Sequence, residues 1–430
     1  MTAVPDFART LLKKAGAPAG HVRAYIEPPF KTESGAEVRP DGAVFVERGG
    51  RKWVALFEVK TQANELRREQ VEAYIDLARS HDYQAVITIS NQISRAHGEH
   101  PLQVDRKKLR RVSLHHWSWS EVLTEAIIQH EHRQISDPEQ AWILGELIAY
   151  LKHPSSGAMQ FQDMGQNWVR VREAARDGTL RSHDPGVAEV VAKWEQFIQY
   201  LCLQLSAELG VEVQQVVGKK DQDAAARLQS RVRELVESKC LSGQIRVRHA
   251  VGPITLEASL AARTTTASVA VEAPEEGKPL TRINWLLRQL RESPEHVTIH
   301  AQFPNAKEGT SARLGSLRED PSLLLLAGDR RRPPRSFTVA LSTEMGTKRS
   351  GSGSFVSEAT HLLLTFYGEV VQSIKPWRTP APKLSPDRAG DNAEQPDNIV
   401  DQAFTEATAP STMGLTNGIS PEDQVAVGEP

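Results

Sequence analysis

Two carboxylates and one ammonium group, those of Asp41, Glu58 and Lys60, stand where a short length of chain can bring them together. Glu58 and Lys60 are two residues apart, so on an extended strand both side chains point to the same face. They end an apolar run, and burying either charge alone would cost several kcal/mol, so each requires a partner. Asp41 is the natural third charge. Two converging carboxylates form an all-oxygen site that suits Mg²⁺ or Mn²⁺.

Lys60 would complete the chemistry of such a site. Beside a divalent cation, its ammonium group could orient or deprotonate an attacking water, or neutralise charge that develops on a scissile phosphate. The spacing of apolar residues then predicts a helix from Glu65 to about Ser80, with Gln70 and Tyr74 one turn apart. Gln70 interrupts an otherwise apolar stripe. This pair suits a helix that packs beside the metal site and holds its carboxylates or the substrate phosphate.

The elements around these residues follow from the same stretch of chain. Pro40-Asp41-Gly42 opens an apolar, β-branched run that predicts a strand over 43–46. Gly49-Gly50 predicts a tight hairpin turn, so the next strand, 53–60, should pair antiparallel with the first. A buried strand over 84–90 follows the helix. The resulting strand-helix-strand unit favours a parallel neighbour and a right-handed crossover.

Together, Asp41, Glu58-Val59-Lys60 and the Gln70-to-Tyr74 spacing resemble the PD-(D/E)xK nuclease superfamily. The resemblance is to its RecB-like branch, in which a Gln-x-x-x-Tyr helix follows the acidic-x-Lys strand, and it covers roughly residues 20 to 130. It implies a restriction-endonuclease-like α/β core with a mixed sheet, bound Mg²⁺, and hydrolysis of DNA phosphodiester bonds. Asp41 and Glu58 would be metal ligands, Lys60 the catalytic lysine, and Gln70 and Tyr74 supporting residues of the catalytic site.

The family often adds an acidic residue upstream of the aspartate. Glu27, at the end of the short apolar run Ala24-Tyr25-Ile26, is our candidate for this additional metal ligand, with Glu33 and Glu37 as competitors. No spacing rule decides among the three.

Other interpretations of the same residues stay open. An isolated Glu-x-Lys on a strand is commonly an exposed salt bridge. A catalytically inactive nuclease-like scaffold that binds nucleic acid or protein, in a stress-response or regulatory role, is an alternative function. A third is that the helical and C-terminal regions define the function, with the N-terminal domain as an accessory.

Two basic runs are candidates for contacts with a phosphate backbone. The first consists of Arg106, Lys107, Lys108, Arg110 and Arg111, and the second lies within 330–335. A solvated surface loop explains either run equally well. His115, His116, His130 and His132 lack a second ligand cluster, so we expect structural roles for them.

Composition divides the chain into four parts. We expect a nuclease-like domain over 1–137 and a helical middle region over 138–240. An α+β domain over 241–378 should begin with a three-stranded antiparallel meander, because its apolar residues alternate with polar ones. The tail, 379–430, is poor in apolar residues and is expected to be disordered.

The whole chain has 430 residues, 39% apolar content and a net charge of −2, as in an ordinary soluble protein. This near-neutral charge argues against a protein that coats nucleic acid, so any DNA-binding surface must be local, and RNA is not excluded. Cys202 and Cys240 are isolated, which fits a reducing cytoplasm. No stretch approaches the roughly 20 apolar residues of a membrane span. A protein partner could bind through the C-terminal domain.

Overall fold

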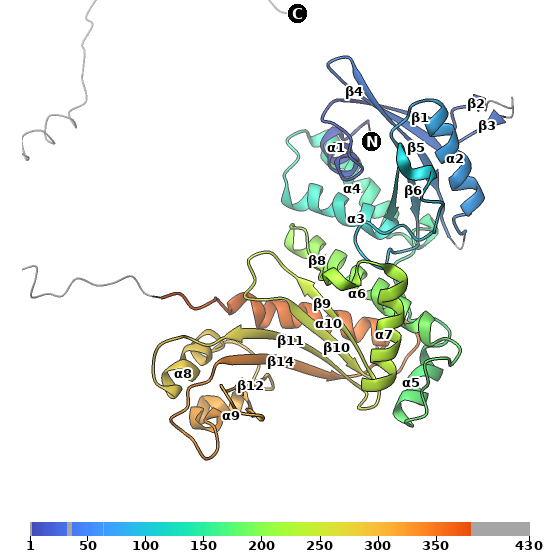
Figure 1. Cartoon of the computed structure of the whole chain (residues 1–430). Coiled ribbons are helices and arrows are strands. Elements are labelled where there is room, and N and C mark those ends of the chain that lie inside the picture. Colours follow the sequence, from blue (N-terminus) through green and yellow to red (C-terminus); the bar gives the residue numbers. More distant parts are fainter. Residues whose placement is uncertain (1, 32–36, 63, 380–430) are drawn as a thin grey trace, which may run out of the picture. The chain divides into compact units, whose positions relative to one another are not determined.

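The N-terminal strands form a five-stranded mixed sheet in the order β1-β4-β5-β6-β7 (Figure 1). The computed structural model describes residues 2–31, 37–62 and 64–379. The strands of this sheet are β1 (His21–Ile26), β4 (Gly42–Arg48), β5 (Arg51–Val59), β6 (Ala85–Ser90) and β7 (Ser113–Ser118). A separate short ribbon pairs β2 (Phe30–Lys31) with β3 (Glu37–Val38). The chain is therefore a mixed α/β protein at its N-terminal end.

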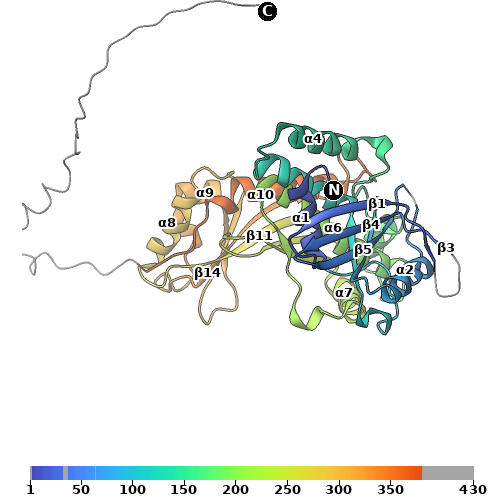
Figure 2. The ribbon, with the colours of Figure 1, turned by 90° about the horizontal axis from the view of Figure 1, so that it is seen from above.

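The predicted glycine hairpin is present. β4 and β5 pair antiparallel up to Arg48 opposite Arg51, and Gly49 and Gly50 between them have φ angles of 55° and 78°. Both angles lie in the left-handed region that glycine enters without steric cost, which is what a two-residue hairpin turn requires. β1 extends the sheet on the other side of β4 (Figure 2). The sequence had indicated only an apolar run at 24–26 for this exposed strand.

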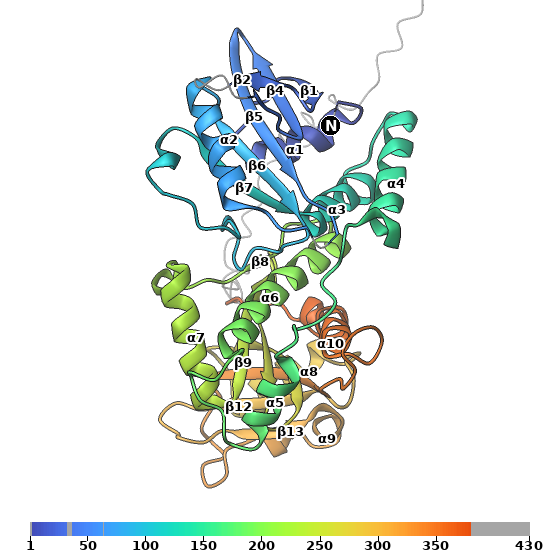
Figure 3. The same cartoon turned by 90° about the vertical axis from the view of Figure 1, so that its right-hand side faces the viewer.

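The predicted strand-helix-strand unit is also confirmed. β6 pairs parallel with β5, and β7 parallel with β6, so these three strands end at the same edge of the sheet (Figure 3). The helix between β5 and β6 is α2 (Arg68–Ser80). This arrangement places Glu58 near the carboxyl end of β5, with the first residues after β6 beside it.

The two faces of the sheet are covered by different helices. α1 (Pro5–Lys14), α3 (Trp119–Ile127) and α4 (Pro138–Lys152) share a core with one face, whereas α2 packs on the other (Figure 1). Phe57 belongs to the first core and Leu56 to the second. Because side chains alternate along a strand, Glu58 points to the same face as Leu56, toward α2. Lys60 follows two residues later.

The C-terminal strands form a seven-stranded antiparallel sheet in the order β13-β12-β14-β11-β10-β9-β8. They are β8 (Gln214–Gln215), β9 (Cys240–Arg246), β10 (Ile254–Ser259), β11 (Thr264–Glu272), β12 (Thr298–Gln302), β13 (Thr310–Arg313) and β14 (Ser336–Glu344). The predicted meander corresponds to β9, β10 and β11. Buried and more exposed residues alternate along them, as expected for a sheet with one covered face.

Some helices of the predicted middle region pack on the N-terminal sheet and others on the C-terminal sheet. α4 joins the N-terminal core, whereas α5 (Trp168–Arg176), α6 (Val187–Leu209) and α7 (Ala224–Ser238) join the core of the C-terminal sheet. That core also includes α8 (Pro279–Gln289), α9 (Leu314–Glu319) and α10 (Phe355–Glu369). Residues 138–240 therefore have no separate core within the described residues, and Met1–Trp377 form one unit. The predicted disordered tail lies, from residue 380 on, outside the described residues.

Candidate active site

Asp41 and Glu58 meet where β4 begins and β5 ends. The carboxylate oxygen Oδ2 of Asp41 accepts the backbone N–H of Val59 at 2.7 Å. Val59 lies between Glu58 and Lys60, so this bond fixes Asp41 against the strand that carries both other charged residues. The structure therefore brings together the three residues that the sequence analysis had selected.

Glu58 is fully buried, with an exposed fraction of 0%. Its carboxylate forms an ion pair with the Lys60 ammonium group, and the nearby Tyr74 hydroxyl also favours its charged form. Among the described residues, neither oxygen accepts a hydrogen bond of good geometry. Burial raises the pKa of Glu58; the hydrogen bond with Lys60 counteracts this shift, and the nearby Asp41 charge adds to it. Buried polar groups are normally fully hydrogen-bonded, so the Glu58 carboxylate, with Lys60 as its one ion-pair partner among the described residues, can accept a second cation.

Gln70 and Tyr74 support the site from α2. The Gln70 Nε2 group donates to the Tyr74 hydroxyl at 3.2 Å, and that hydroxyl donates to the backbone carbonyl of Arg39 at 3.1 Å. Arg39 lies two residues before Asp41. Burial raises the pKa of Tyr74, so its hydroxyl remains a donor. The two residues hold the backbone that precedes Asp41; that they support catalysis stays a prediction.

Three further polar residues, Thr88, His100 and His116, lie on the strands and the loop next to Glu58. Glu58 lies opposite Thr88 on β6, and Thr88 opposite His116 on β7. The Thr88 hydroxyl lies 2.8 Å from Nδ1 of His116 and 2.9 Å from Nε2 of His100. The carbonyl of Gln92 lies 2.7 Å from His116 Nε2.

These contacts determine the protonation of both rings. A carbonyl can only accept, so His116 carries its proton on Nε2 and accepts from Thr88 at Nδ1. Thr88 therefore receives its own hydrogen bond from His100. Burial lowers the pKa of His100 and of His116 to about 4, so both are neutral at pH 7. His116 has a hydrogen-bonding role in this network.

Sequence reasoning missed Thr88 and His100. A signal for Thr88 existed, because a polar residue interrupts the buried strand 84–90 in the register of Glu58. His100 lies in the long loop between β6 and β7, where no periodicity indicates its position.

The additional acidic ligand is not supplied by this structure. The backbone N–H of Glu27 donates to the Asp41 carbonyl at 3.1 Å, but within the described residues no three acidic, His or Cys side chains are placed to hold a metal ion. Glu37 pairs with Arg39 at 2.5 Å. Glu33 lies outside the described residues.

In the first basic run, one cation forms ion pairs within the protein and four are exposed. Lys108 pairs with Asp76 at 2.6 Å and with Glu72 at 3.4 Å, both on α2. Its charge is therefore paired within the protein, and its contact with a phosphate stays a prediction. The other four cations, Arg106, Lys107, Arg110 and Arg111, are exposed.

The residues present fit a divalent cation with few protein ligands. Two carboxylates converge, one of them buried with an oxygen that has no partner, and Mg²⁺ is commonly held by one or two carboxylates while it keeps several waters. A cation there would neutralise the repulsion between Asp41 and Glu58.

Comparison of the chain with protein-family models, curated proteins and solved structures gave no match. In the part of the chain that the structure describes, no helix has the length and apolar content needed to cross a membrane.

Proposed function

We propose that this protein is a Mg²⁺-dependent nuclease that hydrolyses DNA phosphodiester bonds with Asp41, Glu58 and Lys60. The observation that carries the proposal is the buried Glu58 carboxylate, which lies beside Asp41 and, within 2–31, 37–62 and 64–379, pairs with one cation, Lys60. The arrangement of β4, β5, α2 and β6 around it supports a restriction-endonuclease-like core. RNA remains a second possible substrate.

Asp41 and Glu58 would hold the cation, Mg²⁺ or Mn²⁺. When bound, it would supply a Lewis acid for the phosphate and lower the pKa of a coordinated water. Lys60 binds the substrate phosphate or orients the water, and its positive charge stabilises the negative charge of the transition state. Tyr74 and Gln70 keep the backbone before Asp41 in place, so that its carboxylate stays next to Glu58.

The remaining parts of the chain would serve this activity. Four exposed cations in the loop after β6 offer contacts to the nucleic-acid backbone. The C-terminal sheet and its helices would regulate the nuclease or bind a protein partner. We place the reaction in the cytoplasm.

A second candidate is an inactive nuclease-like scaffold that binds nucleic acid or protein. Two observations favour it. Lys60 forms an ion pair with Glu58, and the described residues contain no group of three metal ligands. An ion pair alone would then stabilise the two buried side chains. This alternative predicts that Mn²⁺ does not bind at Asp41 and Glu58.

The decisive experiment compares the full chain with its Lys60→Ala variant on linear, circular and single-stranded DNA and on RNA, with Mg²⁺, Mn²⁺ or EDTA. Lys52→Ala, at the opposite end of β5 with a side chain 68% exposed, is the matched control. We expect metal-dependent cleavage that Lys60→Ala abolishes and Lys52→Ala retains. Cleavage that persists in Lys60→Ala would refute the assignment, and no cleavage of any substrate would favour the scaffold.

A further inference from the structure

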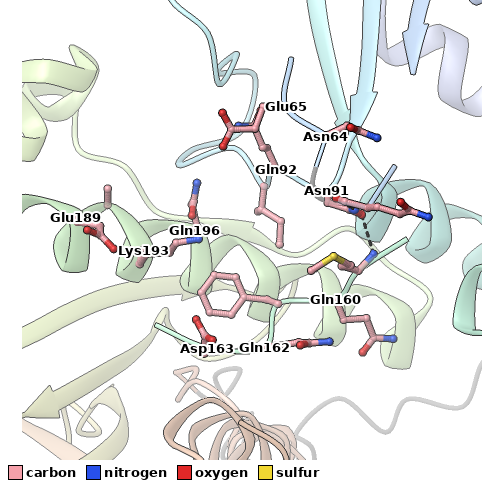
Figure 4. Close-up of a pocket in the computed structure, with 15 residues that line it drawn as sticks. Asn64, Glu65, Asn91, Gln92, Gln160, Gln162, Asp163, Glu189, Lys193 and Gln196 are labelled. Carbon is pink, nitrogen blue, oxygen red and sulfur yellow. Dashed lines mark hydrogen bonds between the residues drawn. The ribbon is translucent and has the colours of Figure 1, made fainter. Parts of the chain in front are cut away.

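A cavity of about 430 Å³ opens between the loops that follow β5 and β6, the segment 159–163 and helix α6 (Figure 4). Its volume is within the range of roughly 300–1,000 Å³ typical of small-molecule sites. Seven amide side chains line it. Four follow the two strands, namely Gln62, Asn64, Asn91 and Gln92, and three, Gln160, Gln162 and Gln196, come from the other elements.

The cavity adjoins the candidate active site. Gln62 lies two residues after Lys60, and Asn91 directly follows the last residue of β6, the strand that carries Thr88. Because β5 and β6 are parallel, both loops leave the same edge of the sheet at which Glu58 lies. A base of a nucleic acid bound at Lys60 can therefore reach this cavity while its phosphates stay outside.

One wall of the cavity is fixed by Asn91. Its amide nitrogen donates to the carbonyls of Gln62, at 2.9 Å, and Gly157, at 2.7 Å, and its oxygen accepts the backbone N–H of Met159 at 2.7 Å. Gly157 has φ of 75°, and a Cβ atom there would lie 3.0 Å from the Gln62 side chain, so this close approach requires glycine. Asn91 thus joins the loop after β5 to the segment that leads into 159–163.

Asn64 donates to the Thr61 carbonyl at 3.1 Å, and the remaining amides do not join two segments as Asn91 does. Oε1 of Gln92 is buried without a hydrogen-bond partner. Gln160, Gln162 and Gln196 line the cavity, and Gln160 and Gln162 are exposed, so their amides can exchange water for a ligand. An amide can both donate and accept, so this lining suits a neutral group that presents donors and acceptors together.

The charges at the cavity argue against a phosphate ligand. Its lining, as described, contains three carboxylates, Glu65, Asp163 and Glu189, but only one cation, Lys193. Glu189 accepts from Asn167 at 2.6 Å, and Asp163 lies 3.5 Å from Arg349. The surface next to the amides is therefore neutral to acidic, which disfavours a nucleic-acid backbone but not a base edge.

Phe161 supplies an aromatic surface in the same lining. Its ring stacks on Phe197 and Tyr200 of α6, with centroid distances of 5.5 and 5.8 Å, so its orientation is fixed. Lys193 Nζ lies 5.7 Å from the same ring centroid, so a base must share the ring with this ammonium group or displace it. Fixed aromatic rings are common platforms for bases of single strands.

We propose that this cavity binds a nucleobase of the nucleic acid that is cut at Asp41, Glu58 and Lys60. Gln162 and Gln196 contact the edge of the base, and Phe161 packs against its face. Asparagine and glutamine pair well with the adenine edge, so a preference for adenine is expected. This inference rests on the proposed nuclease function for the identity of the ligand.

The test measures binding apart from cleavage. Fluorescence anisotropy of the full chain in EDTA would be compared for single-stranded oligonucleotides of dA, dC, dG or dT and for an abasic strand of equal length. The variants are Gln162→Ala and Gln196→Ala, with Gln229→Ala, on an exposed part of α7, as the control. Phe161→Leu adds a variant of the aromatic platform, and thermal unfolding of each variant checks its fold.

We expect one base, adenine first, to bind about tenfold or more tightly than the abasic strand. Gln162→Ala and Gln196→Ala should remove most of that difference without changing abasic binding, whereas Gln229→Ala should keep it. Equal affinity for all strands, no binding of any strand, or amide variants that behave as wild type would each overturn the proposal.

The two proposals can fail separately. Cleavage by the wild type together with base-independent binding would refute the base site and keep the nuclease. Base-dependent binding that the cavity variants abolish, in a protein that cleaves nothing, would keep the base site and refute the nuclease.

Discussion

The Asp41 carboxylate accepts the backbone N–H of Val59 at 2.7 Å, and Val59 is the residue between Glu58 and Lys60. This bond gives Asp41 two separable roles. As an acceptor it joins the start of β4 to the end of β5, and as a charge it would bind the cation. Substitutions that remove one property or both can tell these roles apart.

Asp41→Asn keeps an acceptor oxygen and loses the charge. We expect its free energy of unfolding to match the wild type, while Mn²⁺ affinity, measured by calorimetry, falls on the order of 100-fold or more. Asp41→Ala should additionally lose about 1–3 kcal/mol of stability, because the Val59 N–H loses its partner. Asp6→Asn, on the exposed side of α1, is the control. Unchanged Mn²⁺ affinity in Asp41→Asn would exclude Asp41 as a ligand.

The bond from Tyr74 to the Arg39 carbonyl leads to a second prediction. Tyr74→Phe keeps the buried ring, which is 3% exposed, but removes the donor that holds the backbone before Asp41. We expect a stability loss of about 1 kcal/mol and a fall in kcat with little change in KM, because the metal ligand is misplaced and substrate contacts remain.

Tyr83→Phe is the matched control, since Tyr83 lies beside the same core. Gln70→Ala should have a smaller effect than Tyr74→Phe, and the two together should be less than additive, because Gln70 acts through the Tyr74 hydroxyl. Additive effects on kcat would show that Gln70 has an independent role.

The positions of the main residues of this site could be predicted because the sequence patterns that place them are local. Asp41, the Gly49-Gly50 turn, Glu58, Lys60 and the Gln70-to-Tyr74 spacing all lie within about 35 residues, where strand alternation and helix periodicity fix orientation. The predicted strands and helix in this stretch formed, differing from expectation by a few residues at their ends.

The residues that sequence reasoning missed are positioned by contacts between segments far apart in the chain. His100 reaches Thr88 only because the loop after β6 folds back over the sheet. The Asn91 bonds hold the segment that leads to Gln162 next to Gln62, and Gln196 reaches the same cavity from α6. Similarly, the predicted boundary after residue 137 divides two helices, α3 and α4, that share one core. No periodicity in the sequence encodes such contacts.

The raised pKa of Glu58 predicts a pH-dependent metal effect. Because burial raises it above the usual 4.5, the folded state binds this proton more tightly than the unfolded state. The resulting stability is present below pH 4.5 and is lost as pH rises through the raised pKa. A cation competes with the proton, so the increase in melting temperature caused by Mn²⁺ should grow as pH rises through the same window.

Thermal unfolding with and without Mn²⁺, at a series of pH values from 4.5 upward, measures this effect. Glu58→Gln should remove the dependence on both pH and metal, whereas Glu146→Gln, on an exposed part of α4, should retain it. A Mn²⁺ effect that stays constant over this window would contradict Glu58 as the titrating ligand.

Substitutions in the basic run after β6 should have two different effects, one on DNA binding and one on stability. Removing the exposed charge of Arg106, Lys107 or Arg110 should weaken DNA binding alike for all sequences and reduce the slope of log affinity against log salt by about 0.9 per lost phosphate contact. Lys108→Ala should leave that slope unchanged and reduce stability, because Lys108 pairs with Asp76 and Glu72. If Lys108→Ala lowers the slope like its neighbours, its ion pairs open in the complex.

Arg227 on α7 carries the last prediction, because it joins helix α6 to the loop after β6. Its side chain is 3% exposed and pairs with Glu195 of α6 at 2.8 Å and with Glu99, in the loop after β6, at 2.7 Å. Arg227→Ala would leave the buried Glu195 carboxylate without its partner, which typically costs about 3–5 kcal/mol.

Arg231, one turn further along α7, is the matched control for Arg227, since its pair with the exposed Glu234 should contribute about 0.5 kcal/mol or less. Urea unfolding of both alanine variants measures the contrast. Replacing Arg227 and Glu195 together by Leu should recover much of the lost stability, because no buried charge is then unpaired. A loss below about 1 kcal/mol in Arg227→Ala would mean that water reaches Glu195 and that this triad does not hold the loop carrying His100 in place.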